Sequence, residues 1–331
     1  FMGKLLWQAS EQRTKQSNLI KYYDYLKKNY SLNFDYEYDS LFTWSIVKPD
    51  LFWTSLLNYF DINFSGNWDP AISEGENIYD KKFFPNIQLS YSENIIDNLN
   101  SSPILYINEN GYKKYYKKEE IINKVNVISK YLRSIGVKKG DRIVGVVSNN
   151  AETLISFLAV NSIGAIWSSC SPDFGEQAIL DRFNQIEPKI LFYSSNYVYG
   201  GKKFEILKKI KSIESVLKTL EESICIDTSE NDKIFVDKKL NDYEENNKDL
   251  ADLFFERCNF NDPMYILYSS GTTGKPKCIL HNTGGPLIQH LKEQQLHGDI
   301  CENDKLFYFT TCGWMMWNWL ISGLASKATI V

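Results

Sequence analysis

Short apolar runs alternate with longer segments of mixed polarity through the middle of the chain. The runs at 142–148, 189–193 and 264–268 predict buried strands. The segments at 121–135 and 174–186 have apolar residues at helical spacing and predict amphipathic helices. Repeated strand–helix units of this kind are typical of a mainly parallel sheet with helices on its faces, so we assign the chain to the α/β class, with layered sheets.

The pattern differs before and after this middle part. Apolar residues near helical spacing predict a helix over 15–30, and Pro49 predicts that another helix begins at Asp50–Leu51. Residues 103–116 predict a hairpin with an Asn-Gly turn. Residues 328–331 predict a strand, whose edge we expect to be exposed.

Two polar segments follow the middle strands. Residues 203–213 predict a helix, so Lys203 would lie at its start. Residues 229–250 are rich in Asn, Asp, Glu and Lys and poor in apolar residues. We interpret them as a surface insertion, because they offer little to bury.

Composition narrows the class of protein. The 331 residues are 43% hydrophobic and 24% charged, and the net charge of −4 does not favour nucleic acid or an anionic membrane as a partner. No apolar run approaches the length of a transmembrane helix. The six cysteines include no Cys-x-x-Cys pair and there are three histidines, which argues against a structural zinc site and a disulfide framework. We therefore expect a reducing compartment, the cytosol.

The candidate chemistry lies in the loop after the apolar run at 264–268. Glycines allow positive φ and let backbone N–H groups converge on an anion, while hydroxyls add donors and lysines add charge. The sequence therefore predicts a site for a polyphosphate. The residues that we assign to it are Ser269, Ser270, Gly271, Thr272, Thr273, Gly274, Lys275 and Lys277.

This loop departs from the common nucleotide-binding loop of P-loop NTPases. That loop has four residues between its glycines and then opens a helix, whereas two residues separate Gly271 from Gly274 here. Pro276 biases Lys275 away from helical geometry, so we expect the loop to run from strand to strand. The structural alternative is a solvated turn rich in Gly, Thr and Lys.

Residues 268–277, Tyr-Ser-Ser-Gly-Thr-Thr-Gly-Lys-Pro-Lys, resemble the phosphate loop of the adenylate-forming acyl-CoA synthetases. Three further stretches resemble members of that family that activate acetoacetate. They are the segments at 42–53, 165–175 and 313–323. The resemblance is collinear and covers nearly the whole chain. It implies an N-terminal helical and aromatic region over 1–100 and the first part of an AMP-binding domain over 101–331.

The resemblance implies a ligase that joins acetoacetate to CoA at the expense of ATP. The carboxylate attacks the α-phosphorus of ATP, and the thiol of CoA then attacks the acyl carbon and releases AMP. The protein need supply no nucleophile and no metal site, since Mg²⁺ arrives with ATP. The adenine and ribose contacts, the lid domain and the lysine that promotes adenylation would lie beyond Val331. We therefore assign no catalytic residue, and we expect the chain alone to have little ligase activity.

Further site residues come from the same resemblance. Trp314, Met315 and Met316 would line the acyl pocket, although Met and Trp at helical spacing usually pack in a core. Gly201, Lys202 and Lys203 would meet the CoA nucleotide, although a solvated helix start has the same composition. His281 would lie near the nucleotide, although a lone histidine is more often structural. We assign no individual roles within the motif at 165–175.

Three other functions remain open. A ligase for acetate or propionate shares the phosphate loop and differs in the acyl pocket. A non-catalytic relative would bind nucleotide or a partner without forming a thioester. A kinase or another NTPase fits less well, because the spacing of the loop is wrong and no separate Asp/Glu motif for magnesium is identifiable.

Overall fold

A mainly parallel sheet forms the centre of the molecule. The structure is a computed structural model that describes residues 4–32, 36–77, 79–227, 235–247, 252–269 and 274–331. Within these residues the central sheet has the strand order β10-β7-β5-β6-β12-β13, in which β13 is antiparallel to β12 and the other pairs are parallel. The strands are β5 (Arg142–Val146), β6 (Ile166–Cys170), β7 (Ile190–Tyr193), β10 (Glu222–Cys225), β12 (Pro263–Tyr268) and β13 (Cys278–Asn282). The α/β class predicted from the sequence is confirmed.

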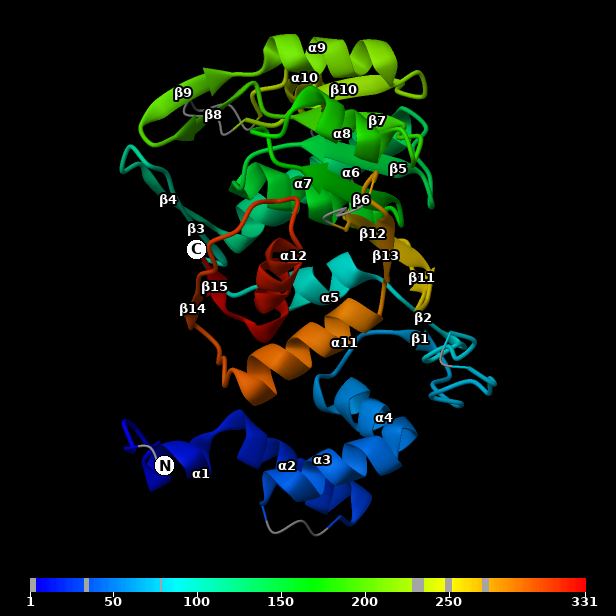
Figure 1. Ribbon diagram of the computed structural model, residues 1–331, viewed down its shortest axis with the longest axis vertical. Helices are drawn as coiled ribbons and strands as arrows, with labels where there is room; N and C mark the ends of the chain where they lie inside the picture. The colour runs from blue at the N-terminus through cyan, green and yellow to red at the C-terminus, as the bar shows by residue number, and fades with distance from the viewer. Residues whose placement is uncertain (1–3, 33–35, 78, 228–234, 248–251, 270–273) are drawn as a thin grey trace.

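Helices cover both faces of this sheet (Figure 1). The strands supply apolar side chains to the cores on both faces. Ile143 belongs to the core on one side and Val144 to the core on the other. The first core includes α6 (Lys118–Ser134) and α7 (Ala151–Ser162), and the second includes α8 (Glu176–Phe183) and α9 (Leu207–Val216). Burial on both faces explains why the strands are continuous apolar runs in the sequence.

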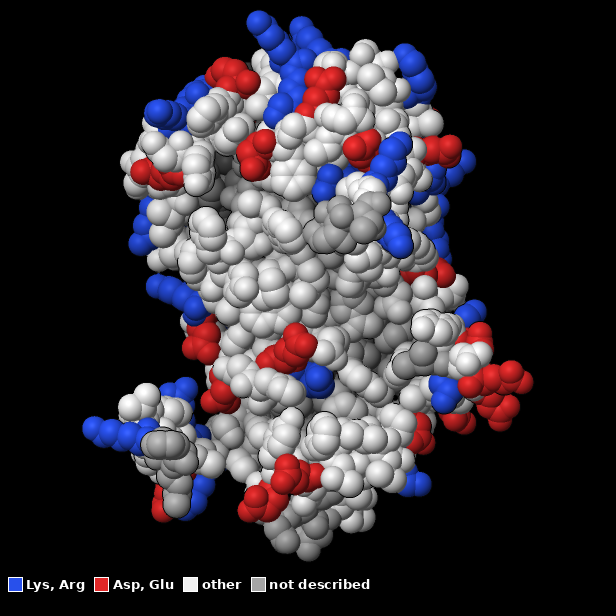
Figure 2. Space-filling model, viewed as in Figure 1, with Lys and Arg blue, Asp and Glu red and all other residues white. Residues whose placement is uncertain are grey.

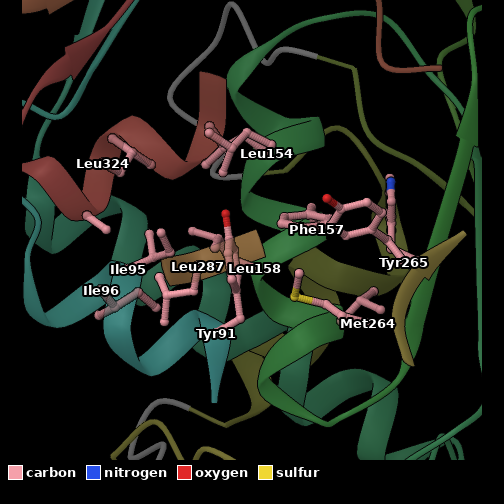
Figure 3. Packing of buried hydrophobic residues seen from close by; sticks show 14 of the residues in the cluster. Tyr91, Ile95, Ile96, Leu154, Phe157, Leu158, Met264, Tyr265, Leu287 and Leu324 are labelled. Carbon is pink, nitrogen blue, oxygen red and sulfur yellow. The ribbon is translucent and has the colours of Figure 1, made fainter. Parts of the chain in front are cut away.

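Phe157 of α7 lies at the centre of the larger core. Its ring packs edge-on against Tyr91, Trp167 and Trp317, with centroids 5.8, 6.1 and 5.5 Å away. Figure 3 shows how side chains of α5 (Tyr91–Asp97), α7 and β12 meet there. The same core contains residues from the helices before residue 60 and from the elements after residue 100, so one apolar core joins them.

Smaller sheets connect distant segments. One has the order β1-β2-β11, another β14-β15-β3-β4, and β8 pairs with β9 as a hairpin. Their strands are β1 (Ser65–Gly66), β2 (Ile87–Leu89), β3 (Ile104–Ile107), β4 (Lys113–Tyr116), β8 (Asn196–Tyr199), β9 (Lys202–Glu205), β11 (Cys258–Asn259), β14 (Lys305–Leu306) and β15 (Thr329–Ile330). The predicted hairpin at 103–116 and the strand within 328–331 are confirmed. The predicted exposed edge of β15 was wrong, because β14 and β3 pair with β15 on its two sides.

The remaining helices lie toward the N-terminus and beside the C-terminal strands (Figure 1). They are α1 (Glu11–Gln16), α2 (Asn18–Tyr30), α3 (Tyr38–Val47), α4 (Pro49–Tyr59), α11 (Gly285–Leu291) and α12 (Met315–Ser322), with a π-helical turn over Lys292–His297 and a 3₁₀ turn over Gly323–Ser326. The predicted helix over 15–30 is confirmed in α2. Pro49 occupies the first turn of α4, as its lack of an N–H predicts. Among the described residues, no helix is both long and apolar enough to span a bilayer.

One prediction was wrong in part, and a second segment contains a helix that was not predicted. The segment 203–213 begins with strand β9 and becomes helical only at Leu207. The reason is the Gly200–Gly201 turn, whose φ angles of +58° and +72° close a two-residue hairpin loop. The segment 229–250 contains α10 (Lys238–Asn246), which is anchored by the fully buried Leu240. Residues 228–234 and 248–251 lie outside the described residues.

Candidate active site

The candidate site lies at the carboxyl edge of the central sheet. Strands β5, β6 and β12 run parallel, so the segments that follow Val146, Cys170 and Tyr268 leave the same edge. In open α/β sheets this edge is where ligands bind. The segment after β12 contains the predicted phosphate loop, and the segment after β6 contains the rest of the motif at 165–175.

The phosphate loop connects two antiparallel strands, as the sequence predicted. Tyr268 pairs with Cys278, and beyond this pair the Ser269 N–H donates to the Lys277 carbonyl at 3.0 Å. The Lys277 N–H in turn donates to Ser269 Oγ at 3.0 Å, which closes the base of the loop. Gly274, Lys275 and Lys277 are exposed. The predicted site residues Ser270, Gly271, Thr272 and Thr273 lie outside the described residues.

Two consecutive serines of β6 link this loop base to the predicted acyl segment. Ser168 Oγ donates to the Ile266 carbonyl at 2.8 Å and lies 3.1 Å from the Tyr268 hydroxyl. Ser169 Oγ donates to the Cys312 carbonyl at 2.6 Å. Both serines are buried, so their hydrogen bonds are shielded from water. Two residues to which the sequence analysis assigned no role therefore hold the two halves of the candidate site together.

Helix α8 supports the phosphate loop from another side. Gln185, just beyond the helix, donates from Nε2 to the Pro276 carbonyl at 2.8 Å. The Arg182 guanidinium lies over the rings of Phe174 and Tyr268, 5.1 and 5.7 Å from their centroids. The sequence analysis missed both residues. Arg182 lies on the polar side of an amphipathic helix and Gln185 follows its end, and neither carries a local signal that separates it from a solvated side chain.

The predicted acyl segment is partly exposed and partly anchored. Trp314 and Met315 are exposed, with 56% and 43% of their surface accessible, and Met316 is half-buried. Trp317, one turn further along α12, is buried and donates from Nε1 to Asn149 Oδ1 at 3.0 Å. The two interpretations of this segment therefore apply to different residues: Trp317 belongs to the core, and Trp314 and Met315 face outward near the sheet edge.

A pocket of about 480 Å³ lies beside β13 and α11 and includes Met315 in its lining. Trp53, Phe83 and Leu280 make its wall mostly apolar, and His281 adds a polar group. The His281 ring stacks on Tyr265, with centroids 4.7 Å apart. Burial lowers the pKa of His281, so its imidazole is neutral near neutral pH and can accept or donate one hydrogen bond.

The predicted CoA residues lie on a different element. Gly201 is in the turn of the β8–β9 hairpin, and Lys202 and Lys203 begin β9 rather than a helix. Both lysines are exposed, and Lys203 pairs with Glu205 at 3.1 Å. Figure 2 shows a broad, mostly uncharged face, with Lys and Arg gathered toward the end of the molecule that carries α9. The hairpin lies at this end (Figure 1).

Comparisons with known proteins agree with this arrangement. The sequence matches the AMP-binding enzyme family over residues 116–331. Acetoacetyl-coenzyme A synthetase of Rhizobium meliloti (strain 1021) is 37% identical over 335 residues, which cover 98% of this chain and 50% of that protein. Acetoacetyl-CoA synthetase of Gallus gallus is 40% identical over 306 residues, which cover 89% of this chain and 46% of that protein.

A solved structure is also similar. Acetoacetyl-CoA synthetase from Streptomyces lividans superimposes with a TM-score of 0.91 at 32% identity, over 99% of this chain and 51% of that chain. The chain thus spans about half the length of the relatives that it matches.

Proposed function

The chain belongs to the AMP-binding enzyme family, and from that premise we propose that it carries the ATP-phosphate and acyl sites of an acetoacetate–CoA ligase. The reaction would be that of an AMP-forming acid–thiol ligase. An oxygen of the acetoacetate carboxylate attacks the α-phosphorus of ATP, and pyrophosphate leaves. The sulfur of CoA then attacks the acyl carbon, and AMP leaves.

One observation carries this proposal. Ser168 and Ser169, adjacent on β6, hold the base of the phosphate loop and the Cys312–Gly313 segment at the same sheet edge. Such a link keeps a polyphosphate and a small acid in a fixed relation, and fixed alignment is the main requirement of a reaction that needs no protein nucleophile. The similar proteins are acetoacetyl-CoA synthetases, which supports the choice of acid.

We assign the roles as follows. Ser269 and Lys277, with the loop between them, would bind the β- and γ-phosphates of ATP in its complex with Mg²⁺. The exposed position of Lys277 at the end of the loop leaves its ammonium free to reach a phosphate. Trp314, Met315 and Met316 would border the acyl group. Gly201, Lys202 and Lys203 would meet the CoA nucleotide. Six free cysteines support the cytosol as the compartment.

The test is acid-dependent exchange of radioactive pyrophosphate into ATP by the native protein, purified from its source. Exchange reports adenylation alone and needs no CoA. We expect acetoacetate to support exchange better than acetate or propionate. Lys277→Ala should reduce exchange with every acid, and Trp314→Ala should reduce exchange while leaving ATP binding unchanged.

The other candidates give different results in this assay. A preference for acetate or propionate would assign the chain to a ligase for another short acid. Nucleotide binding without exchange for any acid would identify a non-catalytic relative. Either result would refute acetoacetate activation.

A further inference from the structure

The tip of the β8–β9 hairpin holds a carboxylate from a distant part of the chain. The N–H groups of Gly200 and Gly201 donate to the two carboxylate oxygens of Glu109, at 3.3 Å to Oε1 and 2.8 Å to Oε2. Glu109 belongs to the turn between β3 and β4, whose tip approaches β8 and β9 in Figure 1. The turn glycines therefore form an anion-binding concavity, and a side chain of the protein occupies it.

Apart from Glu109, the turn has open space beside it. A Cβ added at Gly200 or Gly201 would meet no other atom within 4 Å. Lys202 and Lys203 follow directly and are exposed. Two converging N–H donors next to two exposed lysines in the sequence, one of them paired with Glu205, suit a phosphate monoester, which has three acceptor oxygens and more charge than a carboxylate.

The carboxylate of Glu109 has no part in closing its own turn. That turn is closed by Asn108, whose carbonyl accepts from the Gly111 N–H at 3.0 Å and whose Oδ1 accepts from the Tyr112 N–H at 2.9 Å. Glu109 is exposed, and its two bonds to the hairpin lie at the surface. Bonds of this kind contribute little to stability, so a ligand can displace the carboxylate at small cost.

We propose that Glu109 is an internal competitor for a phosphate monoester at the Gly200–Gly201 turn. The proposal rests on the proposed function, in which this hairpin meets CoA, and it identifies the 3′-phosphate of CoA as the displacing group. The carboxylate and the phosphate use the same N–H donors and repel each other, so only one of them binds at a time. Glu109 thereby sets the affinity for the nucleotide end of CoA and keeps the turn occupied when CoA is absent.

The test compares CoA with dephospho-CoA, which lacks only the 3′-phosphate, by isothermal titration calorimetry on the purified protein. Glu109→Gln keeps the shape of the side chain and removes its charge, and Glu109→Ala removes the group. Glu76→Gln, an exposed glutamate on the β1–β2 connection, is the matched control for the change in net charge. We expect both Glu109 variants to bind CoA about fivefold more tightly, because an exposed charged pair contributes less than about tenfold. Binding of dephospho-CoA should not change.

The outcomes separate competition from other roles. An equal gain for CoA and dephospho-CoA would refute the assignment of the 3′-phosphate. Unchanged binding of CoA would refute competition, and weaker binding would show that Glu109 holds the hairpin in place for the ligand. The pyrophosphate exchange assay does not involve CoA. If the Glu109 variants show the expected effect but no acid supports exchange, the phosphate site is supported and the ligase function is refuted.

Discussion

Replacing Ser169 by Ala tests the link between the two halves of the candidate site. The Ser169 hydroxyl donates to the Cys312 carbonyl at 2.6 Å and accepts from Trp167 Nε1 at 3.0 Å. Trp167 is 1% exposed and Ser169 is 3% exposed, so water cannot replace the lost hydroxyl without entering the core. Each of the two buried groups left without its partner costs about 1–3 kcal/mol, so we expect the free energy of unfolding to fall by roughly 2–6 kcal/mol.

Ser168→Ala is the matched variant from the neighbouring position. It removes the hydrogen bond to the Ile266 carbonyl and the contact with the Tyr268 hydroxyl, both at the base of the phosphate loop. Because consecutive side chains of a strand point to opposite faces, the two variants disturb different halves of the site. Ser169→Ala should raise the KM for the acid more than the KM for ATP, and Ser168→Ala should do the reverse.

Urea unfolding measures the stability of both variants, and pyrophosphate exchange at varied acid and varied ATP measures the two KM values. The design separates a general loss of stability from a local displacement, since both variants lose a buried hydroxyl from the same strand. Two results would refute the reasoning. One is a change in unfolding free energy of Ser169→Ala below about 0.5 kcal/mol, the range of ordinary surface substitutions. The other is an equal rise of both KM values in both variants.

Three further perturbations have defined outcomes. Lys124 Nζ lies 2.9 Å from Glu152 Oε1 with both side chains nearly inaccessible, so Lys124→Met should cost about 3–5 kcal/mol in urea unfolding. Adding Glu152→Gln should recover most of the lost free energy of unfolding. A double variant as unstable as Lys124→Met would show that the loss does not come from the broken ion pair. Gln185→Ala removes one hydrogen bond to the phosphate loop and should raise the KM for ATP about fivefold in the exchange assay. Arg182→Ala should also raise this KM. An unchanged KM in both variants would show that α8 does not support the loop. Burial lowers the pKa of His290 to about 4, below its ordinary value of 6.5. Between these two pH values His290 is protonated in the unfolded chain and neutral in the folded protein. The free energy of unfolding therefore falls as the pH drops from 6.5 toward 4. Between pH 7.5 and pH 5 this loss should be about 2 kcal/mol and should be absent in His290→Gln, and parallel pH profiles would exclude His290 as its source.

Local features of the sequence predicted the central elements. The apolar run at 264–268, the glycines after it and Pro276 together specify a strand, a loop and a returning strand, and all three signals lie within about one hairpin of sequence. The helix at Pro49 is equally local, since proline in the first turn of a helix needs no partner for an N–H. These predictions succeeded because each signal lies within the element that it specifies.

The failures are of two kinds. The helix predicted from Lys203 begins only at Leu207, because two glycines before two lysines suit a helix start as well as a hairpin. The segment forms a hairpin instead, because β8 pairs with β9 and the rings of Tyr197 and Phe204 stack with their centroids 5.0 Å apart. The support of the phosphate loop by Gln185 spans 91 residues, and no local pattern of a polar helix face reveals such a contact.

The serines of β6 carried a signal that could have been used. This strand is buried along its whole length, on both faces of the sheet. A hydroxyl in such a strand is costly unless it is hydrogen-bonded, and within a sheet the backbone of the strand is already paired. Ser168 and Ser169 must therefore find acceptors for their hydroxyls, and these acceptors lie in β12 and in the Cys312 segment. Apolar side chains would fill the same space, but they would leave the loop base and the acyl segment unconnected. Two adjacent serines in a doubly buried strand at the ligand-binding edge thus predict an anchoring role from the sequence pattern alone, and the identity of the anchored segments is what the fold adds.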